Sequence, residues 1–215
     1  HYVSLDDVDL EETPYDFVQI SLPGRYVYEE ADKALDKRLN VFIFSDDVSI
    51  EDEIKLKKKG RKDDLLVMGP DCGVAMVGGV CLGAGSIMDA GDVGIAAASG
   101  SGAQEVACLL EKYGVGISSL LGTGGRDLYP EVGGMEMIQA MEVLEKDPKT
   151  EVIVLVSKLA DLNVMREVLT KADQLTKPVA AIFLGSDESI FSGHKAIPAY
   201  SLEEAARIAA ELLGK

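Results

Sequence analysis

Short runs of apolar residues alternate along the chain with segments of helical periodicity, and glycine, serine, aspartate or proline bounds most of the runs. The runs are mostly continuous rather than alternating, which is typical of strands covered on both faces of a sheet. This pattern predicts strands at 18–22, 41–44, 65–68, 93–98, 117–121, 152–156, 179–184 and 197–200.

The segments between the runs carry apolar residues on one side of a helix. Helices are predicted at 26–39, 50–58, 103–113, 135–144, 164–175 and 202–213. The last of them opens with Ser-Leu-Glu-Glu at 201–204, the pattern of a capping box. Strands and helices that alternate at this spacing predict βαβ units, and therefore an α/β fold with parallel sheets and right-handed crossovers.

A glycine-rich stretch without helical period interrupts this alternation near residues 70–92. It separates three strand–helix elements from five, so we predict a first α/β domain at 1–70, a connector at 71–92 and a second α/β domain at 93–215. Three strands make a small sheet, since sheets usually have about four to six. We therefore expect the first lobe to be incomplete, with earlier strands missing or its edge covered by another segment.

Composition and charge narrow the class of protein. The 215 residues are enough for a sizeable core, and 37 acidic residues against 21 basic ones give a net charge of −16. Such a charge is repelled by nucleic acids and by anionic membrane surfaces, so neither is expected as a partner. Three cysteines without a C-x-x-C pair and no signal peptide favour the cytoplasm. Cysteines and histidines show no ligand spacing, so no metal site is expected.

The segment 98–105 (ASGSGAQE) follows a predicted strand and opens a helix. Small residues there allow backbone N–H groups to converge, and the positive end of the helix dipole favours an anion. The same place is the carboxyl end of a strand, where ligands bind in doubly wound folds. A plain tight turn capped by serine is the alternative, because a glycine-rich turn alone is weak evidence. The candidate anion-binding residues are Ser99, Gly100, Ser101 and Gly102.

The segment 121–127 (LGTGGRD) follows the next predicted strand. Glycines permit close approach of a ligand, and Arg126 is able to neutralise a carboxylate or phosphate. A flexible loop with a surface pair between Arg126 and Asp127 is the alternative. Two such loops on consecutive strands open onto one crevice, which favours binding of a small anionic substrate. The candidates here are Gly122, Thr123, Gly124, Gly125 and Arg126.

Other reactive residues have simpler interpretations. Cys72 would need a nearby base to act as a nucleophile, and none is evident, so a buried structural thiol is favoured. We expect Cys108 on the apolar side of its helix, the lysines between 55 and 62 on a solvated helix face, and His194 in an exposed loop.

Several stretches together resemble the alpha-subunit side of the succinyl-CoA synthetases, and most of all the FdrA-type branch of acyl-CoA synthetases. They run in order over residues 16–212, nearly the whole chain. The matching stretches are 44–48 (FSDDV), 66–73 (LVMGPDCG), 98–105, 122–128 (GTGGRDL), 132–134 (VGG), 154–158 (VLVSK) and 176–179 (TKPV).

The resemblance implies a fold and a chemistry. Residues 1–70 are similar to the latter part of a CoA-binding, Rossmann-like domain, and the chain from about 90 is similar to the flavodoxin-like ligase domain. Such ligases pass phosphate between an acyl phosphate, a histidine and a nucleotide, while CoA takes the acyl group, so CoA and a nucleotide are implied. Residues 99–102 match the segment that stabilises the phosphohistidine, and Glu105 matches a glutamate that contacts it. Glu105 is therefore the catalytic candidate.

One departure from the family leaves the function open. The active histidine of the synthetases lies well upstream of the final strand, whereas His194 runs almost directly into it. The first hypothesis is a component of an NDP-forming acyl-CoA ligase. The second is a carbamoyltransferase subunit that acts on oxamate or carbamoyl phosphate in purine-nitrogen breakdown, without a phosphohistidine. The third is a non-catalytic scaffold subunit. Each implies a homo-oligomer or a partner subunit.

Overall fold

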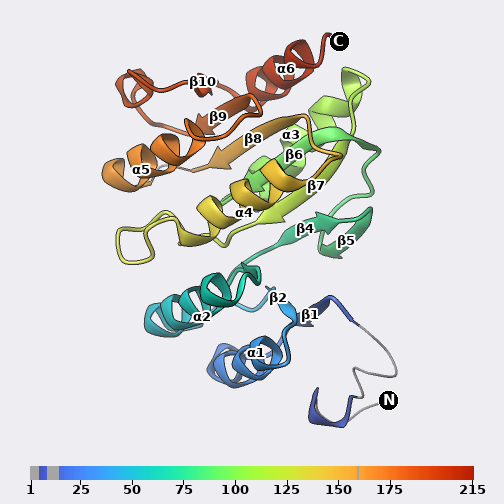
Figure 1. Ribbon diagram of the computed structural model, residues 1–215, viewed down its shortest axis with the longest axis vertical. Helices are drawn as coiled ribbons and strands as arrows, with labels where there is room; N and C mark the ends of the chain where they lie inside the picture. The colour runs from blue at the N-terminus through green and yellow to red at the C-terminus, as the bar shows by residue number, and fades with distance from the viewer. Residues whose placement is uncertain (1–4, 9–14, 159) are drawn as a thin grey trace.

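The computed structural model describes residues 5–8, 15–158 and 160–215. It contains two α/β lobes, each built on its own sheet, and the chain passes from the smaller first lobe to the larger second one (Figure 1). No helix in these ranges is long and apolar enough to cross a membrane.

The first lobe has a three-stranded parallel sheet in the order β1-β2-β3. Its strands are β1 (Phe17–Ile20), β2 (Asn40–Ile43) and β3 (Val67–Met68), connected by α1 (Val27–Asp36) and α2 (Ile50–Asp63). The apolar side of α1 packs on this sheet through Val27 and Leu35, which are almost fully buried. Two short 3-10 helices, η1 (Leu5–Asp7) and η2 (Gly24–Tyr26), complete the described part of this lobe.

The second lobe has a seven-stranded sheet in the order β10-β9-β8-β6-β7-β4-β5. Five strands are parallel, and they form its centre and one edge: β6 (Ala90–Ala97), β7 (Ile117–Gly122), β8 (Val152–Ser157), β9 (Val179–Phe183) and β10 (Ile197–Pro198). The predicted parallel pairing of the runs at 93–98, 117–121, 152–156 and 179–184 is therefore confirmed.

Helices cover both faces of this sheet, as an α/β fold requires. α3 (Gly100–Lys112) and α6 (Leu202–Leu212) share one apolar cluster with one face, while α4 (Met135–Lys146) and α5 (Leu162–Ala172) share a second cluster with the other. A 3-10 helix, η3 (Glu188–Phe191), leads from β9 towards β10. The capping box of α6 forms as predicted at Ser201, whose Oγ accepts the N–H of Glu204 at 3.0 Å.

An antiparallel hairpin, β4 (Val74–Val77) and β5 (Val80–Gly83), was not predicted. It lies in the range 71–92 that we predict as a connector, and β4 pairs with β7, so the hairpin extends the second sheet. Gly78 and Gly79 both have positive φ, 58° and 81°, which two-residue hairpin turns require. A Gly-Gly pair between two apolar runs is a hairpin signal, which the surrounding glycines obscured. The division of the chain into domains at these positions stays a prediction.

Candidate functional site

A pocket of about 290 Å³ lies beside the carboxyl ends of β6 and β7, at the start of α3. The turn from β3 to β4 closes one side of it, and the N–H groups of Asp71 and Cys72 tie this turn to the end of β2 through the carbonyls of Ser45 and Ile43. The two glycine-rich segments predicted from the sequence therefore meet at one site. Among the predicted anion-binding residues, Ser99, Gly100, Ser101, Gly122, Gly124 and Gly125 line the pocket.

Backbone donors are available on two sides of this pocket. Ser99 caps α3, since its Oγ accepts the N–H of Gly102 at 3.4 Å and its carbonyl accepts the N–H of Ala103. The N–H groups of Gly100 and Ser101 donate to no described residue, as is usual for the first turn of a helix. In the second glycine-rich segment, the N–H groups of Gly124 and Gly125 donate to no described residue either.

The glycines of the second segment are needed for packing as well as for the pocket. A Cβ at Gly122 would lie 2.3 Å from the Sγ of Cys72, and one at Gly124 would lie 2.5 Å from the carbonyl oxygen of Pro70. Both glycines thus allow the turn between the lobes to approach β7. At Gly125 a Cβ would meet only side-chain atoms, the nearest being the Oδ2 of Asp71 at 2.8 Å and the Nζ of Lys158 at 3.4 Å.

Lys158 follows β8 and is the basic residue that lines this pocket in the described part of the chain. Its side chain is exposed, and no hydrogen bond or ion pair joins it to a described residue. Lys158 belongs to 154–158, one of the stretches that resemble the succinyl-CoA synthetases, but the sequence analysis predicts no role for it. Its position directly after a central parallel strand was the available signal, because such positions face the ligand edge of the sheet.

Cys72 also lines the pocket, but its thiol is poorly suited to nucleophilic attack. The residue is buried, and burial raises the pKa of the thiol to about 12. Its Sγ donates a hydrogen bond to the carbonyl of Val74 at 3.4 Å. This agrees with the buried structural thiol that the sequence favours. Cys108, in contrast, is exposed, so its predicted place on the apolar side of α3 is wrong.

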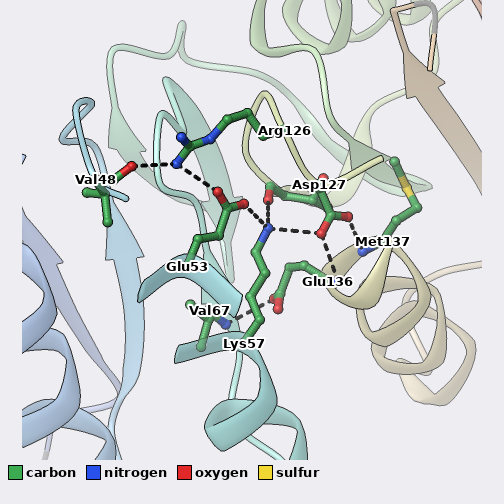
Figure 2. A network of polar contacts seen from close by, with 9 residues as sticks. Val48, Glu53, Lys57, Val67, Arg126, Asp127, Glu136 and Met137 are labelled. Atoms are coloured by element: carbon green, nitrogen blue, oxygen red, sulfur yellow. Dashed lines mark hydrogen bonds and ion pairs between the residues drawn. The ribbon is translucent and has the colours of Figure 1, made fainter. Parts of the chain in front are cut away.

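Arg126 does not reach the pocket. Its Nη2 lies 2.8 Å from the Oε2 of Glu53 and donates to the carbonyl of Val48 at 2.8 Å, both in the first lobe (Figure 2). The alternative interpretation of this segment, a surface pair between Arg126 and Asp127, does not hold, because Asp127 is fully buried and Arg126 pairs with Glu53.

The largest departure from the sequence analysis concerns Lys57. We expected it on a solvated helix face, but its side chain is completely buried. Its Nζ donates to the Oε1 of Glu53 at 2.7 Å, to the Oδ1 of Asp127 at 2.9 Å and to the carbonyl of Thr123 at 2.9 Å (Figure 2). These three bonds use all three N–H groups of the ammonium.

The local signal for this burial was present in α2. Glu53, Leu56, Lys57 and Gly60 are its buried residues, and they follow the i, i+3, i+4, i+7 spacing of one helix face. Two charged residues on that face obscured the stripe, since paired charges are the exception in protein interiors.

Asp127 extends the buried network to α4. Its two carboxylate oxygens accept the N–H groups of Glu136 and Met137 at 3.1 and 2.8 Å, so it caps this helix from nine residues away. Burial lowers the pKa of Lys57, but attraction to Asp127 and Glu53 outweighs it, and the pKa ends above its usual value. Burial raises the pKa of the Glu136 carboxyl to about 8, against the attraction of Lys57. The Oε1 of Glu136 accepts the N–H of Val67 at 3.0 Å.

The remaining predicted residues lie outside the pocket. Glu105 is exposed on α3, and Gly102 is buried at the start of that helix. Thr123 is buried, and its Oγ1 has no hydrogen-bond partner among the described residues. His194 lies near the end of α5, where its Nδ1 is 2.7 Å from the Oδ2 of Asp173. α5 ends before β9 begins, so His194 is at the amino-end edge of the sheet, opposite the pocket.

A second hollow, of about 340 Å³, adjoins the pocket. It lies at the carboxyl ends of β1 and β2, and it shares Asp71 and Gly73 with the first. The ligand edges of the two sheets therefore meet across the turn that joins them. The other lining residues are Ser21, Leu22, Phe44, Ser45 and Asp46.

A fold with one parallel and one mostly parallel sheet, and with a pocket where the carboxyl ends of their strands meet, has clear relatives. No family model matches the chain. Curated relatives at about 25% identity are alpha subunits of succinate–CoA ligases and related CoA ligases. The alpha subunit 2 of an ADP-forming succinate–CoA ligase from Archaeoglobus fulgidus is 26% identical over 172 residues, which are 77% of this chain and 58% of that protein. The chain is therefore homologous to CoA-ligase alpha subunits.

One relative has a higher sequence identity to this chain than the ligase subunits do. The protein YahF from Escherichia coli, named as uncharacterized, is 45% identical over 170 residues, 79% of this chain but 33% of YahF. A subunit of an ADP-forming sulfoacetate-CoA ligase from Bilophila wadsworthia is 25% identical over 186 residues, 82% of this chain and 61% of that subunit. The chain thus spans about a third of YahF and about three fifths of the ligase subunits.

Solved structures show the same fold at lower identity. The ATP citrate lyase of Methanothrix soehngenii, in complex with citrate and coenzyme A, superposes with a TM-score of 0.78 at 18% identity, over 99% of this chain and 41% of the lyase. The dinucleotide-forming acetyl-coenzyme A synthetase 1 of Ca. Korarchaeum cryptofilum, in complex with phosphate and ADP, has a TM-score of 0.74 at 18% identity, over 98% and 50% of the two chains. The predicted fold class is confirmed.

Proposed function

We propose that this chain is part of an alpha-type subunit of an NDP-forming acyl-CoA ligase, and that its pocket holds the phosphate or carboxylate of the reacting acyl group. The observation that carries this proposal is the pocket itself. Residues with free N–H groups, in the first turn of α3 and in the loop at 124–125, line it together with Lys158. Homology to CoA-ligase alpha subunits supports the same conclusion.

Electrostatics favours an anion at this place in an otherwise acidic chain. The net charge of −16 repels anions over most of the surface. Inside the pocket, the positive end of the α3 dipole and the Lys158 ammonium reverse that preference. Phosphate and carboxylate offer several oxygen acceptors to donors that converge from different sides.

The second hollow is the proposed binding site for CoA. Leu22 and Phe44 present partly exposed apolar surface there, which suits the uncharged arm of CoA that ends in the thiol, and Ser45 and Asp46 add polar groups. CoA would supply the thiol that takes the acyl group. Because the two hollows share Asp71 and Gly73, a CoA thiol in the second hollow would lie beside an acyl phosphate in the first. Attack of the thiol on the acyl carbon would form the thioester and release phosphate.

The proposed assembly includes a partner subunit in the cytoplasm. Glu105 is exposed beyond the pocket rim, so the catalytic role that we predict for it would be exercised against a partner or a second copy of the chain. Relatives are themselves named as subunits of ligases.

The position of His194 favours a second candidate, the carbamoyltransferase of the FdrA type. No histidine of the described residues lines the pocket, and His194 is bound to Asp173 at the opposite edge of the sheet. Carbamoyl transfer between carbamoyl phosphate and a small carboxylate such as oxamate needs anion sites but no phosphohistidine.

One experiment separates these candidates. The chain is purified with its natural partner subunits and assayed in two ways: release of ADP from ATP that depends on CoA and an organic acid, and release of phosphate from carbamoyl phosphate that depends on oxamate. We expect the first for a ligase and the second for a carbamoyltransferase. Lys158→Met should lower kcat/KM for the anionic substrate at least ten-fold, the loss of about one charge-assisted hydrogen bond. Lys112→Met, an exposed change on α3, is the control. Absence of both activities in the intact complex contradicts both candidates.

A further inference from the structure

The buried Lys57 ammonium reaches the pocket indirectly, through the main chain. Two of its three bonds go to carboxylates, but the third goes to the carbonyl of Thr123, the residue before the pocket-lining Gly124. Because the side chain is completely buried and all of its donors are used, this bond has a fixed direction (Figure 2).

A peptide plane transmits that direction to the next N–H group. In a trans peptide the C=O and the following N–H point in opposite directions, and Gly69–Pro70 is the cis peptide in the described chain. The N–H of Gly124 therefore points away from Lys57, and no described residue accepts it. We propose that Lys57 is a positioning residue, which turns the Thr123–Gly124 peptide so that its N–H faces the pocket.

Because residue 124 is a glycine, its own backbone preferences do not fix the orientation of this peptide, and a further interaction is needed to hold it. Rotation of a peptide plane changes ψ of the residue before it and φ of the residue after it, and glycine tolerates both signs of φ. Gly124, with φ of +92°, has no Cβ to restrict the rotation of this peptide. The bond from Lys57 holds one of the two orientations. The claim that the Gly124 N–H donates to an anion in the pocket rests on the proposed function. The orientation of the Thr123–Gly124 peptide does not depend on that function.

Charge neutralisation alone is the competing account of Lys57. Lys57 and Arg126 face Glu53 and Asp127, two cations against two carboxylates. On that account Lys57 stabilises the fold but leaves the Gly124 peptide free. The two accounts differ in which variants disturb Gly124.

Three variants of the full chain separate them. Lys57→Met removes the bond to Thr123. The pair Glu53→Gln with Lys57→Met removes the same bond while one positive and one negative charge disappear together, so it keeps the test valid where the single variant fails to fold. Asp127→Asn is the matched control, since it perturbs the same network but leaves the Lys57–Thr123 bond in place.

Chemical shifts and hydrogen exchange, measured on the ligand-free protein, test the inference. We expect both Lys57→Met variants to shift the carbonyl ¹³C of Thr123 and the amide ¹⁵N of Gly124 and to slow hydrogen exchange at the Gly124 amide, which no longer faces the open pocket. The control should leave these signals near their wild-type values. If the Lys57→Met variants leave Gly124 unchanged, or if Asp127→Asn moves it equally, the inference is overturned.

Titration with inorganic phosphate tests the proposed function separately. Wild-type signals at Gly100, Ser101 and Gly124 should shift, and the Lys57→Met variants should bind phosphate about ten-fold more weakly, the loss of one hydrogen bond to a charged group. A wild-type chain that does not bind phosphate contradicts the anion pocket, whereas the ligand-free signals still decide the orientation. Phosphate binding of undiminished affinity in the variants overturns the positioning role while the pocket stands.

Discussion

At Glu136, a carboxyl group without access to water lies beside a buried ammonium and a second carboxylate. The neighbouring side chains Lys57, Arg126, Glu53 and Asp127 already balance two positive charges with two negative ones. A further charge on the buried Glu136 carboxyl would be uncompensated, so the network is electrically neutral when Glu136 holds its proton. This agrees with a pKa that burial raises to about 8.

The raised pKa of Glu136 predicts a pH dependence of stability. Between its ordinary pKa of 4.5 and about 8, the folded chain keeps a proton that the unfolded chain has lost. The stabilisation is therefore fully present below pH 4.5 and is lost as pH rises towards 8, with a slope of at most about 1.4 kcal/mol per pH unit. Glu136→Gln keeps the shape without the titration, so its free energy of unfolding in urea should vary less over this range. Parallel pH profiles of wild type and variant contradict the prediction.

Cys72 and Cys108 should differ strongly in their reactivity towards an alkylating reagent. Burial raises the pKa of the Cys72 thiol to about 12, which lowers its thiolate population about a thousand-fold relative to an ordinary thiol. Cys108 is exposed. Iodoacetamide at pH 8 should label Cys108 within minutes and leave Cys72 unmodified in the folded chain, as peptide mass spectrometry can measure. Labelling of both at similar rates would show that the turn from β3 to β4 opens in solution.

At the scale of elements, two aspartates cap helices on the same face of the second sheet in different surroundings. Asp161 accepts the N–H groups of Asn163 and Val164 at the open end of α5. Asp127 accepts those of Glu136 and Met137 while also holding Lys57 in the interior.

Truncation of these two caps should therefore differ in effect. Asp161→Ala should lower the free energy of unfolding by about 1 kcal/mol, the usual loss of an N-cap. Asp127→Ala should lower it by about 3–5 kcal/mol, because it breaks a buried ion pair. Urea unfolding of both variants measures the difference. Equal losses would mean that the buried network adds nothing to the cap.

Elements with a clean apolar period are those that the sequence predicts well. α4 and α6 begin at the predicted residues, and the four central strands pair as expected. Their buried side chains are almost all apolar, with Ser118 and Ser157 as the exceptions. The helix at α2 is predicted, but the expected solvated lysine face fails there, because its buried stripe contains Glu53 and Lys57. The hairpin around Gly78 is not predicted at all. In α2 the compensating partner, Asp127, is 70 residues away from Lys57. A local pattern carries no information about it.

At the scale of the whole molecule, His194 and the pocket lie at opposite ends of the parallel strands of the second sheet. His194 pairs with Asp173 where α5 ends, whereas the pocket lies at the carboxyl ends of β6 and β7. We expect no acid-labile phosphate on His194 after incubation of the intact complex with ATP and an organic acid. Phosphopeptide mass spectrometry under non-acidic conditions checks this. Phosphate found there would contradict the arrangement of the two edges and restore a phosphohistidine at this residue.

The same arrangement explains how much of the site the sequence predicts. Glycine-rich turns after consecutive parallel strands must open at one edge, and Gly100 and Gly124 do line one pocket. The side chains at that edge follow no such rule. Arg126 turns to Glu53 because a buried carboxylate is a stronger partner than solvent, and Lys158 remains as the basic residue beside the glycines.

The β4–β5 hairpin has a consequence for recombining this chain with its homologues. Composition alone would place a fusion junction anywhere in the glycine-rich stretch, but β4 pairs with β7, and Gly73 and Val74 form part of the pocket wall. A chimera joined after the hairpin would take its pocket wall from one parent and its helix start from the other. It would also leave β7 with an unmatched neighbour, an open edge of the kind that promotes aggregation. Chimeras that exchange the lobes should therefore keep residues 69–83 with the second sheet.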